Sequence, residues 1–575
     1  MARLTQKDAN RIRVGICLLL LAVLQVVLFH DIWTPDLLFG DRGDGRFNNC
    51  VCESWYRFFS GQTAFNDLQS FYPMTNSLAW SDMLLGFALP YSLLRALGVG
   101  MLAANKIVLD LFFLVGLFSM FWLLHRGFRF SLKSSLLGAG LTFCSCTFAS
   151  LSNHTQMLFM AWIPVTTALI VFFLQNCGPD GSRKKRIWAG SLAVVSIGLE
   201  FWTAFYVGYF HFLLLAAVAV MWVIQAFFTQ RGWGKVFCQS VARIWKELFL
   251  YFACLLVWFV PLVKLYLPVL RQFGGRGAKE ILLYSPYPYE ILSTVRSGGV
   301  LARLEDQMYR SLSGDMLATN GEFGYGLSLV VLALFAAAFV YLLVRFFVCL
   351  LKKQPYPLFA QVGLACGASA IVLYLTIISN GTESLWIHLY RFIPGATAIR
   401  AIARLIAFLI LPVGIAIAGA FEDASRLLLR KNKKAAAPLV AFALLVLLVF
   451  AAFESPYFYL RWSAREQQAE LDAVAETPAD CQCFFMYFGE EAGQPMPMVN
   501  VGGWILAQTR GLYTLNGYSG QFPDGWSMIG LESDYLNGVK NWVEANRIDT
   551  STLYAYDMDN NVWIPYGQLM AENQP

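Results

Sequence analysis

A series of long apolar runs constrains the fold of this chain more than any other feature of its sequence. A run of about 18 or more apolar residues can cross the hydrocarbon core of a bilayer as a helix. The runs occupy residues 14–30, 101–124, 134–152, 156–175, 187–203, 204–228, 246–268, 325–350, 357–379, 401–420 and 435–453. The chain is only 14% charged, whereas a soluble domain is about 25% charged. We therefore predict an all-α polytopic membrane bundle of about 11 spans.

Positive charges between the runs predict how the bundle is oriented. Basic clusters lie at residues 126–133, 183–186, 231–246, 352–353 and 426–434. They fall in alternate connections, and short cytoplasmic connections are the ones enriched in Lys and Arg. This pattern predicts a plasma (inner) membrane protein with a cytoplasmic N-terminus and with outer loops at 31–100 and 269–324.

The apolar segment 83–98 does not fit as a span. It contains Pro90 and Arg95 and is shorter than a spanning helix needs. If it crossed the bilayer, every later basic cluster would move to the outer side. We expect it to lie at the outer interface instead, as a helix within the first outer loop.

The C-terminal part of the chain changes in composition. Residues 455–575 have fewer long apolar runs and higher proportions of Asp, Asn, Gly and Trp than residues 1–454. Short patterns such as 483–488 and 552–556 are typical of strands. We predict a transmembrane domain at 1–454 and a small extracytoplasmic α/β domain at 455–575.

Two Cys-x-Cys pairs stand outside the apolar runs. They are Cys50 with Cys52 and Cys481 with Cys483. Unpaired thiols, local pairs and a disulfide between the two segments are all open, because sequence does not fix connectivity.

Carboxylates in the first outer loop are the strongest candidates for chemistry. Asp41 and Asp44 lie three residues apart among glycines, where a carboxylate could take a proton from an attacking hydroxyl as a general base. The alternative is a solvated turn, since Asp-Gly is a common turn pair. Asp82 begins segment 83–98, where Ser81 or Asp82 could instead cap the helix.

Other polar residues lie on the same predicted outer face. Glu53 and Arg57 have helical spacing, which predicts an ion pair across one turn. His154 and Gln156 are at the outer end of a run, where a histidine is more often a structural hydrogen-bonding group.

Two arginines lie at the start of the run at 401–420. Arg400 and Arg404 are four residues apart and would share a face of the helix entering the membrane. Guanidinium groups suit phosphate. The alternative is a pair that binds lipid head groups.

Several classes of site are not indicated. The zinc spacings, the Walker loop and the Gly-rich dinucleotide motif are missing from the sequence. The net charge of +6 comes from basic residues in short connections, so no nucleic acid partner is expected. A divalent metal held by Asp41, Asp44 or Asp82 stays open, and the cofactor is unknown.

The set of motifs resembles the GT-C superfamily of polytopic glycosyltransferases, and within it the YfhO-like bacterial membrane proteins. The resemblance covers most of the chain and rests on residues 40–47, 53–57, 71–73, 78–82, 284–286, 394–404 and 515–520. It implies a sugar donor linked to a polyprenyl phosphate or diphosphate, membrane lipid around the donor, and a glycan, lipid or protein acceptor in the cell envelope.

The resemblance also implies roles for individual residues. Asp44 would be the general base, Asp41 its substitute and Asp82 a second acidic group. The substrate-binding residues would be Arg46, Glu53, Tyr72, His154, Gln156, Glu280, Tyr284, Arg400 and Arg404. No protein metal site is assigned.

Two other functions stay open. One is a transporter or flippase of lipid-linked saccharides, and the other is a non-catalytic membrane protein of the same fold. A transporter would need ionisable residues deep in several spans. Those positions are nearly all apolar here, with Asp110 the clearest exception, which favours the enzyme.

Overall fold

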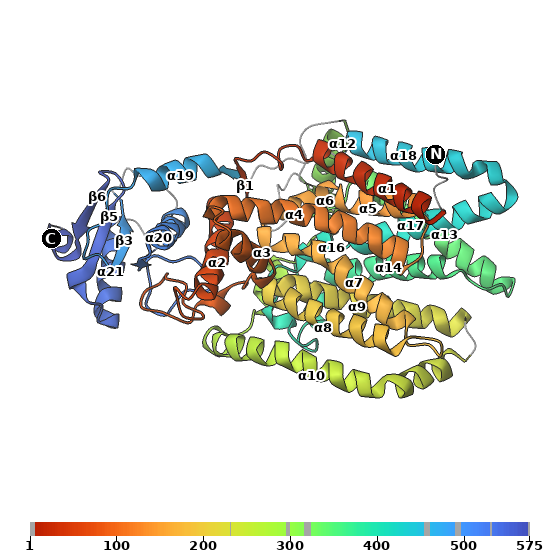
Figure 1. Ribbon diagram of the computed structural model, residues 1–575, viewed down its shortest axis with the longest axis horizontal. Coiled ribbons are helices and arrows are strands. Elements are labelled where there is room, and N and C mark those ends of the chain that lie inside the picture. The colour runs from red at the N-terminus through yellow and green to blue at the C-terminus, as the bar shows by residue number, and fades with distance from the viewer. Residues whose placement is uncertain are drawn as a thin grey trace.

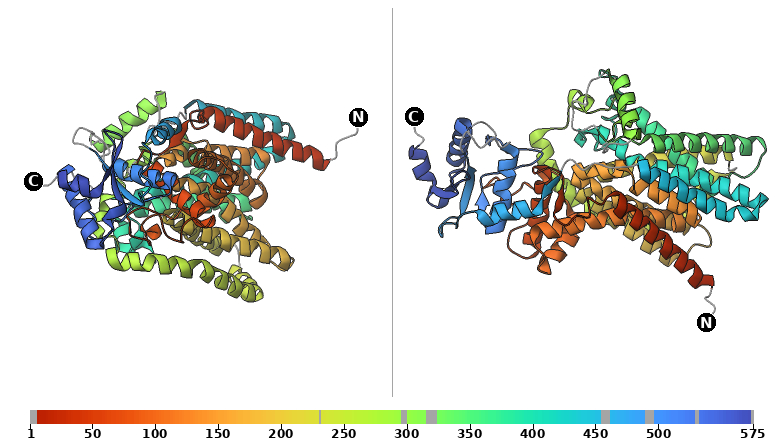
Figure 2. Two further views of the ribbon diagram at one scale, coloured as in Figure 1. Left: turned by 60° about the vertical axis from the view of Figure 1, so that its left-hand side comes forward. Right: turned by 90° about the horizontal axis from the view of Figure 1, so that it is seen from above.

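The computed structural model describes residues 6–229, 232–294, 300–314, 324–453, 461–488, 496–528 and 532–572. A long bundle of roughly aligned helices occupies most of the molecule, and a small sheet with its own helices lies at one end (Figure 1). The views in Figure 2 show the same division from two other sides. The predicted fold class, a polytopic helical bundle followed by a small α/β unit, is confirmed.

Within the described residues, nine helical segments are long and apolar enough to cross a membrane. They are Asp8–Leu28, Met101–Gly127, Leu132–Asn153, Thr155–Gln175, Phe205–Thr229, Trp233–Phe273, Leu329–Leu351, Leu358–Ile377 and Ile402–Lys431. The two remaining predicted runs form α8 (Arg183–Thr203) and α18 (Ala436–Phe453). The protein is therefore a multi-pass membrane protein.

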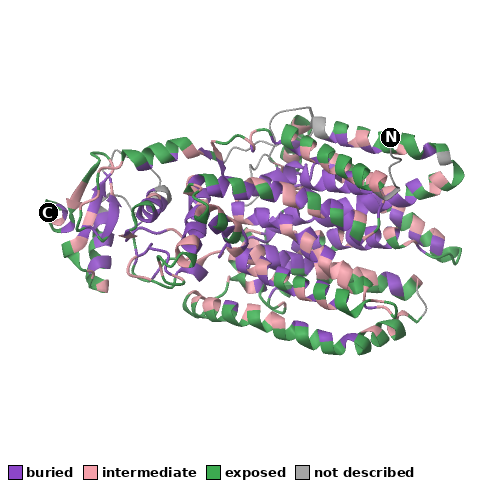
Figure 3. Cartoon of the chain, in the orientation of Figure 1, coloured by how far each residue is buried: buried purple, intermediate pink, exposed green. Residues whose placement is uncertain are grey.

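Burial follows the arrangement expected in lipid. The interior of the bundle is buried, whereas helices at its outside expose much of their length (Figure 3). In the most apolar window of α10 (Trp233–Phe273), only 11% of the residues are buried. Such apolar exposure suits contact with lipid chains.

Two predicted runs are not continuous helices. The run at 134–152 breaks after α5 (Leu132–Phe143), where Ser145 caps the short α6 (Cys146–Ser150). The run at 401–420 starts with a 3₁₀ turn at Ile402–Arg404, before α16 (Leu405–Phe408) and α17 (Ile410–Lys431). The prediction that Arg400 and Arg404 share one α-helical face is therefore wrong.

The first outer loop forms two short helices, α2 (Asp44–Phe59) and α3 (Leu85–Ala96). With 12 residues, α3 is about 18 Å long, too short to span the bilayer. Leu89, Leu93 and Leu97 are exposed at spacings of four residues, so they lie on one side of this segment. That apolar stripe supports the interfacial position, which stays a prediction.

The C-terminal unit contains a four-stranded sheet in the order β4-β3-β5-β6. Strands β3 (Cys483–Tyr487), β4 (Tyr513–Thr514) and β5 (Leu553–Asp557) are parallel, and β6 (Val562–Pro565) is antiparallel to β5. Helices α19 (Ala464–Ala473), α20 (Met496–Arg510), α21 (Glu532–Asn546) and α22 (Tyr566–Glu572) accompany it. Both predicted strand patterns are strands. The proposed boundary at residue 455 lies outside the described residues.

The C-terminal unit is fastened to the first outer loop. Strand β1 (Leu37–Phe39) pairs antiparallel with β2 (Arg461–Ser463), and the Trp504 indole donates to the Leu68 carbonyl at 2.6 Å. The four cysteines of the two Cys-x-Cys pairs are buried and free, so a disulfide between the segments is not formed. Hydrogen bonds and strand pairing make the junction instead.

Candidate functional site

Asp44 is the first residue of α2, at the end of the bundle that faces the sheet (Figure 1). The Asp41 carboxylate accepts hydrogen bonds from the amides of Gly43 at 2.8 Å and Asp44 at 2.5 Å. A Cβ on Gly45 would come within 2.4 Å of the Phe39 carbonyl, so only glycine fits there. Asp41 and Gly45 thus fix the direction in which α2 begins.

Two side chains from distant parts of the chain hold the Asp44 carboxylate. Tyr518, in the loop after β4, donates its hydroxyl to Oδ1 at 2.7 Å. His154, between two 3₁₀ turns (Leu151–Asn153 and Thr155–Trp162), places Nδ1 3.3 Å from Oδ2. The Asp44 side chain keeps 30% of its surface exposed, and a carboxylate has about four acceptor positions. It can therefore accept a further hydrogen bond.

Arg404 lies on the other side of His154. Its Nη2 is 3.4 Å from Nε2 of the ring. A guanidinium only donates hydrogen bonds, so in the neutral ring Nε2 is the acceptor and Nδ1 carries the proton that faces Asp44. The three residues form a chain of hydrogen bonds from cation to carboxylate.

The surroundings of Asp44 act on its acidity in opposite directions. Burial raises its pKa, but the hydrogen bond and the charge of His154, the hydrogen bond from Tyr518 and the charge of Arg404 together outweigh burial, and the net pKa lies below its ordinary value. Asp44 is therefore ionised at neutral pH. Burial, and then the charge of Asp44, raise the pKa of Tyr518, so this hydroxyl keeps its proton.

Tyr206, in α9 (Phe205–Thr229), orders the arginine segment. Its hydroxyl accepts hydrogen bonds from the amides of Arg400 at 2.9 Å and Ala401 at 3.1 Å. Its ring lies 5.2 Å from the Arg404 guanidinium carbon, and the Tyr284 ring lies 4.9 Å from that of Arg400. Both guanidinium groups are stacked on aromatic faces. The charge of Arg404 acts on the Asp44 carboxylate, and the charge of Arg400 acts on Tyr518, which binds Asp44.

Asp82 lies in the field of the same arginine. Its Oδ1 accepts a hydrogen bond from the Phe205 amide at 2.9 Å, at the start of α9. The expectation that Ser81 or Asp82 caps the following helix is therefore wrong, since the N-cap of α3 is Leu84 and has no side-chain hydrogen bond. Burial raises the pKa of Asp82 to about 6, against opposing effects from the Phe205 amide and Arg404.

Gln156 binds a neighbouring residue of α2 and not Asp44 itself. Its Oε1 accepts a hydrogen bond from Asn48 Nδ2 at 3.0 Å, and the same nitrogen donates to Thr155. Asn48 lies one turn after Asp44 in α2, so this contact ties α2 to the segment that carries His154. The structure therefore brings Asp44, Asp82, His154, Arg400 and Arg404 to one place, with Gln156 and Tyr284 beside them.

Four predicted site residues lie elsewhere. Arg46 donates to the carbonyl of Arg42 and, at 3.2 Å, to Gln467. The Tyr72 ring packs 5.2 Å from that of Tyr513. Glu280 pairs with Arg276 at 3.0 Å in the first turn of α11 (Ala278–Leu283). These contacts join parts of the fold.

Glu53 is the fourth. Its carboxylate receives two hydrogen bonds from Arg95, at 2.8 and 3.0 Å, and one from the Tyr91 hydroxyl at 2.6 Å. The expected ion pair with Arg57 is not formed. Arg57 instead donates to the main-chain carbonyl of Gln508 in α20, because the C-terminal unit reaches this side of α2.

The carboxylates do not fit a shared metal ion. Those of Asp41 and Asp82 accept backbone amides, and that of Asp44 is held by Tyr518 and His154. Within the described parts of the chain, no group of three or more His, Cys, Asp or Glu side chains could hold a metal ion. We therefore derive no step through a metal.

Sequence patterns did not reveal the role of two tyrosines. Tyr518 belongs to the C-terminal unit, and Tyr206 is one of several aromatic residues at the start of α9. Tyr518 is 474 positions from Asp44, and no local pattern links residues so far apart. The nearest sequence signal is the Asn-Gly-Tyr-Ser-Gly motif at 516–520, since a tyrosine among glycines is poorly placed for a core.

Comparison with known proteins gives a fold. The structure is similar to the oligosaccharyltransferase AglB from Archaeoglobus fulgidus in complex with an inhibitory peptide and a dolichol-phosphate, with a TM-score of 0.51 and 12% identity over 95% of this chain and 69% of that chain. The chain has the GT-C fold. ArnT from Cupriavidus metallidurans in the apo state has a TM-score of 0.44 and 14% identity over 86% of this chain and 84% of that chain.

Comparisons of the amino-acid sequence alone found no similar protein or family. No family model and no curated protein matches the chain. The GT-C resemblance predicted from the motifs is thus confirmed at the level of fold, and the YfhO-like assignment stays a prediction.

Proposed function

We propose that this chain is a membrane glycosyltransferase that moves a sugar from a polyprenyl-phosphate-linked donor to an acceptor of the cell envelope. One observation carries the proposal: an ionised, partly exposed carboxylate lies beside two stacked guanidinium groups at one end of a membrane bundle. AglB, which shares the fold, was solved with a dolichol-phosphate. We assign the same kind of lipid-linked donor to this chain.

The two arginines would hold the donor phosphate. Each guanidinium can offer paired N–H donors to phosphate oxygens, and stacking on Tyr206 and Tyr284 restricts its orientation. Arg404 is buried, so its charge is screened little by solvent. As the bond between the sugar and the phosphate breaks, negative charge grows on the phosphate, and fixed positive charge stabilises it.

Asp44 would receive the proton of the acceptor. The acceptor hydroxyl oxygen forms a bond to the anomeric carbon, the bond from that carbon to the phosphate oxygen breaks, and the electron pair leaves with the polyprenyl phosphate. The hydroxyl proton passes to Asp44. A carboxylate of lowered pKa suffices as a base, because the hydroxyl becomes acidic only as its oxygen bonds to the sugar.

His154 and Tyr518 would act as positioning residues. His154 connects Arg404 to Asp44, so the carboxylate and the phosphate-binding cation keep a fixed separation. Tyr518 comes from the C-terminal unit, which therefore completes the site. Asp82 stays the second acidic candidate, since it also lies in the field of Arg404.

The proposed orientation puts this site outside the cell. The connections from α13 (Leu329–Leu351) to α14 (Leu358–Ile377), and from α17 to α18, lie at the end of the bundle away from the sheet (Figure 1). They contain the basic clusters at 352–353 and 430–434. Since basic connections face the cytoplasm, this arrangement supports an extracytoplasmic C-terminal unit and Asp44 cluster.

The test is mass spectrometry of envelope glycans and lipids from cells that lack the gene and carry a plasmid copy. The wild-type copy should restore a product heavier by one sugar, and Asp44→Asn should not. Asp472→Asn makes the same chemical change at an exposed position in α19 and should restore it. Equal amounts of protein in the membrane are the control. Full restoration by Asp44→Asn would remove Asp44 as the base.

A transporter would need ionisable residues inside the bundle that are available to bind its substrate. Several ionisable residues inside the described helices pair with one another, such as Asp110 with Lys106 at 2.7 Å and Asp423 with Arg345 at 3.0 Å. Pairs satisfied in this way favour a structural role over a substrate path. Movement of labelled lipid-linked sugar across vesicles, without a new glycosidic bond, would reverse the choice.

A further inference from the structure

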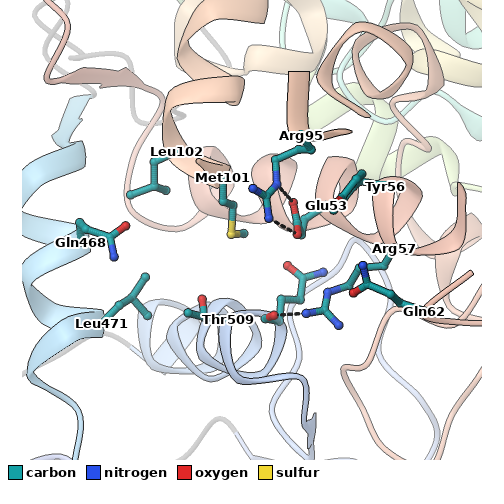
Figure 4. A pocket seen from close by; sticks show the side chains of 11 residues that line it. Glu53, Tyr56, Arg57, Gln62, Arg95, Met101, Leu102, Gln468, Leu471 and Thr509 are labelled. Atoms are coloured by element: carbon teal, nitrogen blue, oxygen red, sulfur yellow. Dashed lines mark hydrogen bonds and ion pairs between the residues drawn. The ribbon is translucent and has the colours of Figure 1, made fainter. Parts of the chain in front are cut away.

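A polar cavity lies beside the C-terminal half of α2 (Figure 4), and none of the residues that line it belongs to the Asp44 cluster. Its volume is about 230 Å³, and α2, α3, α4 (Met101–Trp122), α19 and α20 contribute to its wall. Its uncharged polar lining consists of Tyr56, Gln62, Gln468, Gln508 and Thr509. Glu53 follows Asp44 by nine residues, so the cavity begins about 13 Å farther along the helix.

One charged pair in the wall is already neutral. Arg95 and Glu53 form a two-point ion pair (Figure 4), and the remaining guanidinium nitrogen of Arg95 donates to the Val99 carbonyl at 2.8 Å. Tyr91 adds a hydrogen bond to the same carboxylate. This pair brings no net charge to the cavity and has little left to offer a ligand.

Arg57 is different. It donates through Nη2 to the main-chain carbonyl of Gln508, which carries no charge. Its Nε is buried and lacks a hydrogen-bond partner among the described residues, and so does the side-chain Oε1 of Gln508. Buried donors without acceptors cost stability. The Nε itself is covered, so what Arg57 gives the cavity is a net positive charge, carried by a guanidinium group that forms no ion pair within the described parts of the chain.

We propose that this cavity binds a small hydroxyl-rich anion of the glycerophosphate type, with its phosphate on Arg57 and its hydroxyls on the neutral side chains. Guanidinium is the side-chain group best matched to phosphate, and Gln, Thr and Tyr both donate to and accept from hydroxyls. The volume is smaller than the roughly 300–1,000 Å³ of sites for drug-sized ligands, which limits the ligand to one small group.

The same chemistry has two sources. One is soluble glycerol phosphate, and the other is the head group of phosphatidylglycerol. Met101 and Leu102 line the cavity, and the exposed leucines of α3 lie on the neighbouring helix. A lipid head group therefore has an apolar surface nearby, and the experiment has one arm for each source.

The first arm is calorimetric titration of the full-length protein in neutral detergent with glycerol 1-phosphate. We expect saturable binding, and no binding of glycerol at the same concentration. Arg57→Gln should weaken the affinity by about tenfold or more, because it removes a charged hydrogen-bond donor. Arg465→Gln removes the same charge from an exposed position of α19 and should leave the affinity within about twofold.

A second variant keeps the test decisive if Arg57→Gln fails to fold. Thr509→Trp fills the cavity from an exposed position of α20 and leaves Arg57 in place, so it should also abolish binding, with thermal unfolding as the check on the fold. Asp44→Asn should bind like the wild type. Failure of the proposed transferase activity is thereby distinguished from failure of this site.

The second arm compares nanodiscs of phosphatidylglycerol with nanodiscs of phosphatidylcholine. If phosphatidylglycerol raises the Tm of the wild type and of Arg465→Gln but not of Arg57→Gln, the ligand is the lipid head group. If only the soluble arm depends on Arg57, the ligand is soluble. Absence of Arg57-dependent binding in both arms, or equal binding by wild type and Thr509→Trp, would overturn the proposal.

Discussion

The two ends of α2 hold carboxylates in contrasting ways. Glu53 is 3% exposed and is fixed by two hydrogen bonds from Arg95 and one from Tyr91. Asp44 is 30% exposed and is held by an imidazole and a phenol, with Arg404 one residue farther away. A carboxylate in a two-point ion pair stabilises the fold. A carboxylate held by an imidazole and a phenol, with a guanidinium group one residue farther away, can still accept a proton from a substrate.

The largest expected effects separate these two roles. Asp44→Asn should lower the transfer rate by about 10²–10⁴-fold, the usual contribution of a general base, with little change in Tm. Glu53→Gln should instead lower the free energy of unfolding by about 3–5 kcal/mol, because it leaves Arg95 without its buried partner. Transfer kinetics and denaturant unfolding of both variants measure this. The same phenotype in both variants would contradict the assignment of different roles to Asp44 and Glu53.

Arg404 should come next. Arg404→Gln is expected to lower the transfer rate by about 10²–10³-fold, because a fixed charge facing the leaving phosphate is lost. The matched control is Arg391→Gln, which removes an exposed arginine from the same segment. If the two variants behaved alike in the transfer assay, the phosphate site would lie elsewhere.

The pH dependence of the transfer rate distinguishes Asp44 from Asp82. Burial raises the pKa of Asp82 to about 6, so its carboxylate is ionised above that pH and neutral below it, whereas Asp44 stays ionised to lower pH. If ionised Asp82 is needed, transfer should fall about tenfold per pH unit below pH 6. This limb should vanish in Asp82→Asn. A limb unchanged in that variant would exclude Asp82 as its cause.

The smallest effect is expected from the C-terminal unit. Tyr518→Phe removes one hydrogen bond to Asp44 and should slow transfer by about 2- to 10-fold. Tyr513→Phe makes the same change at a hydroxyl that binds Asp67 instead, at 2.9 Å, and should leave transfer near the wild-type rate. Equal rates for Tyr518→Phe and the wild type would show that the Asp44 carboxylate does not need this contact.

The fold was predictable because its signal is local. Each apolar run carries its own evidence for a membrane helix, and strand periodicity at 483–488 and 552–556 needs no partner to be recognised. The interruptions of the helices at 134–152 and 401–420 were not predictable in the same way. Ser145 caps a short helix inside an apolar run, and Tyr206 accepts the Arg400 amide from another helix. Tertiary contacts of this kind override the pattern.

The site was predictable in part for a related reason. Asp44 and Arg404 stand out by composition, the first among glycines and the second as a charged residue at the start of an apolar run. Their neighbours come from far along the chain, as Tyr518 does. For Glu53, by contrast, a local pattern predicted the wrong partner. Helical spacing predicted Arg57 as its partner, but the partner that the folded loop supplies is Arg95 on α3.

The most direct test is a cryo-EM structure of the full-length protein with bound polyprenyl phosphate. We expect the phosphate oxygens to lie within about 3 Å of guanidinium nitrogens of Arg400 or Arg404. The Asp44 carboxylate should face the same space. A phosphate bound at another end of the bundle, or separated from Asp44 by packed side chains, would contradict it.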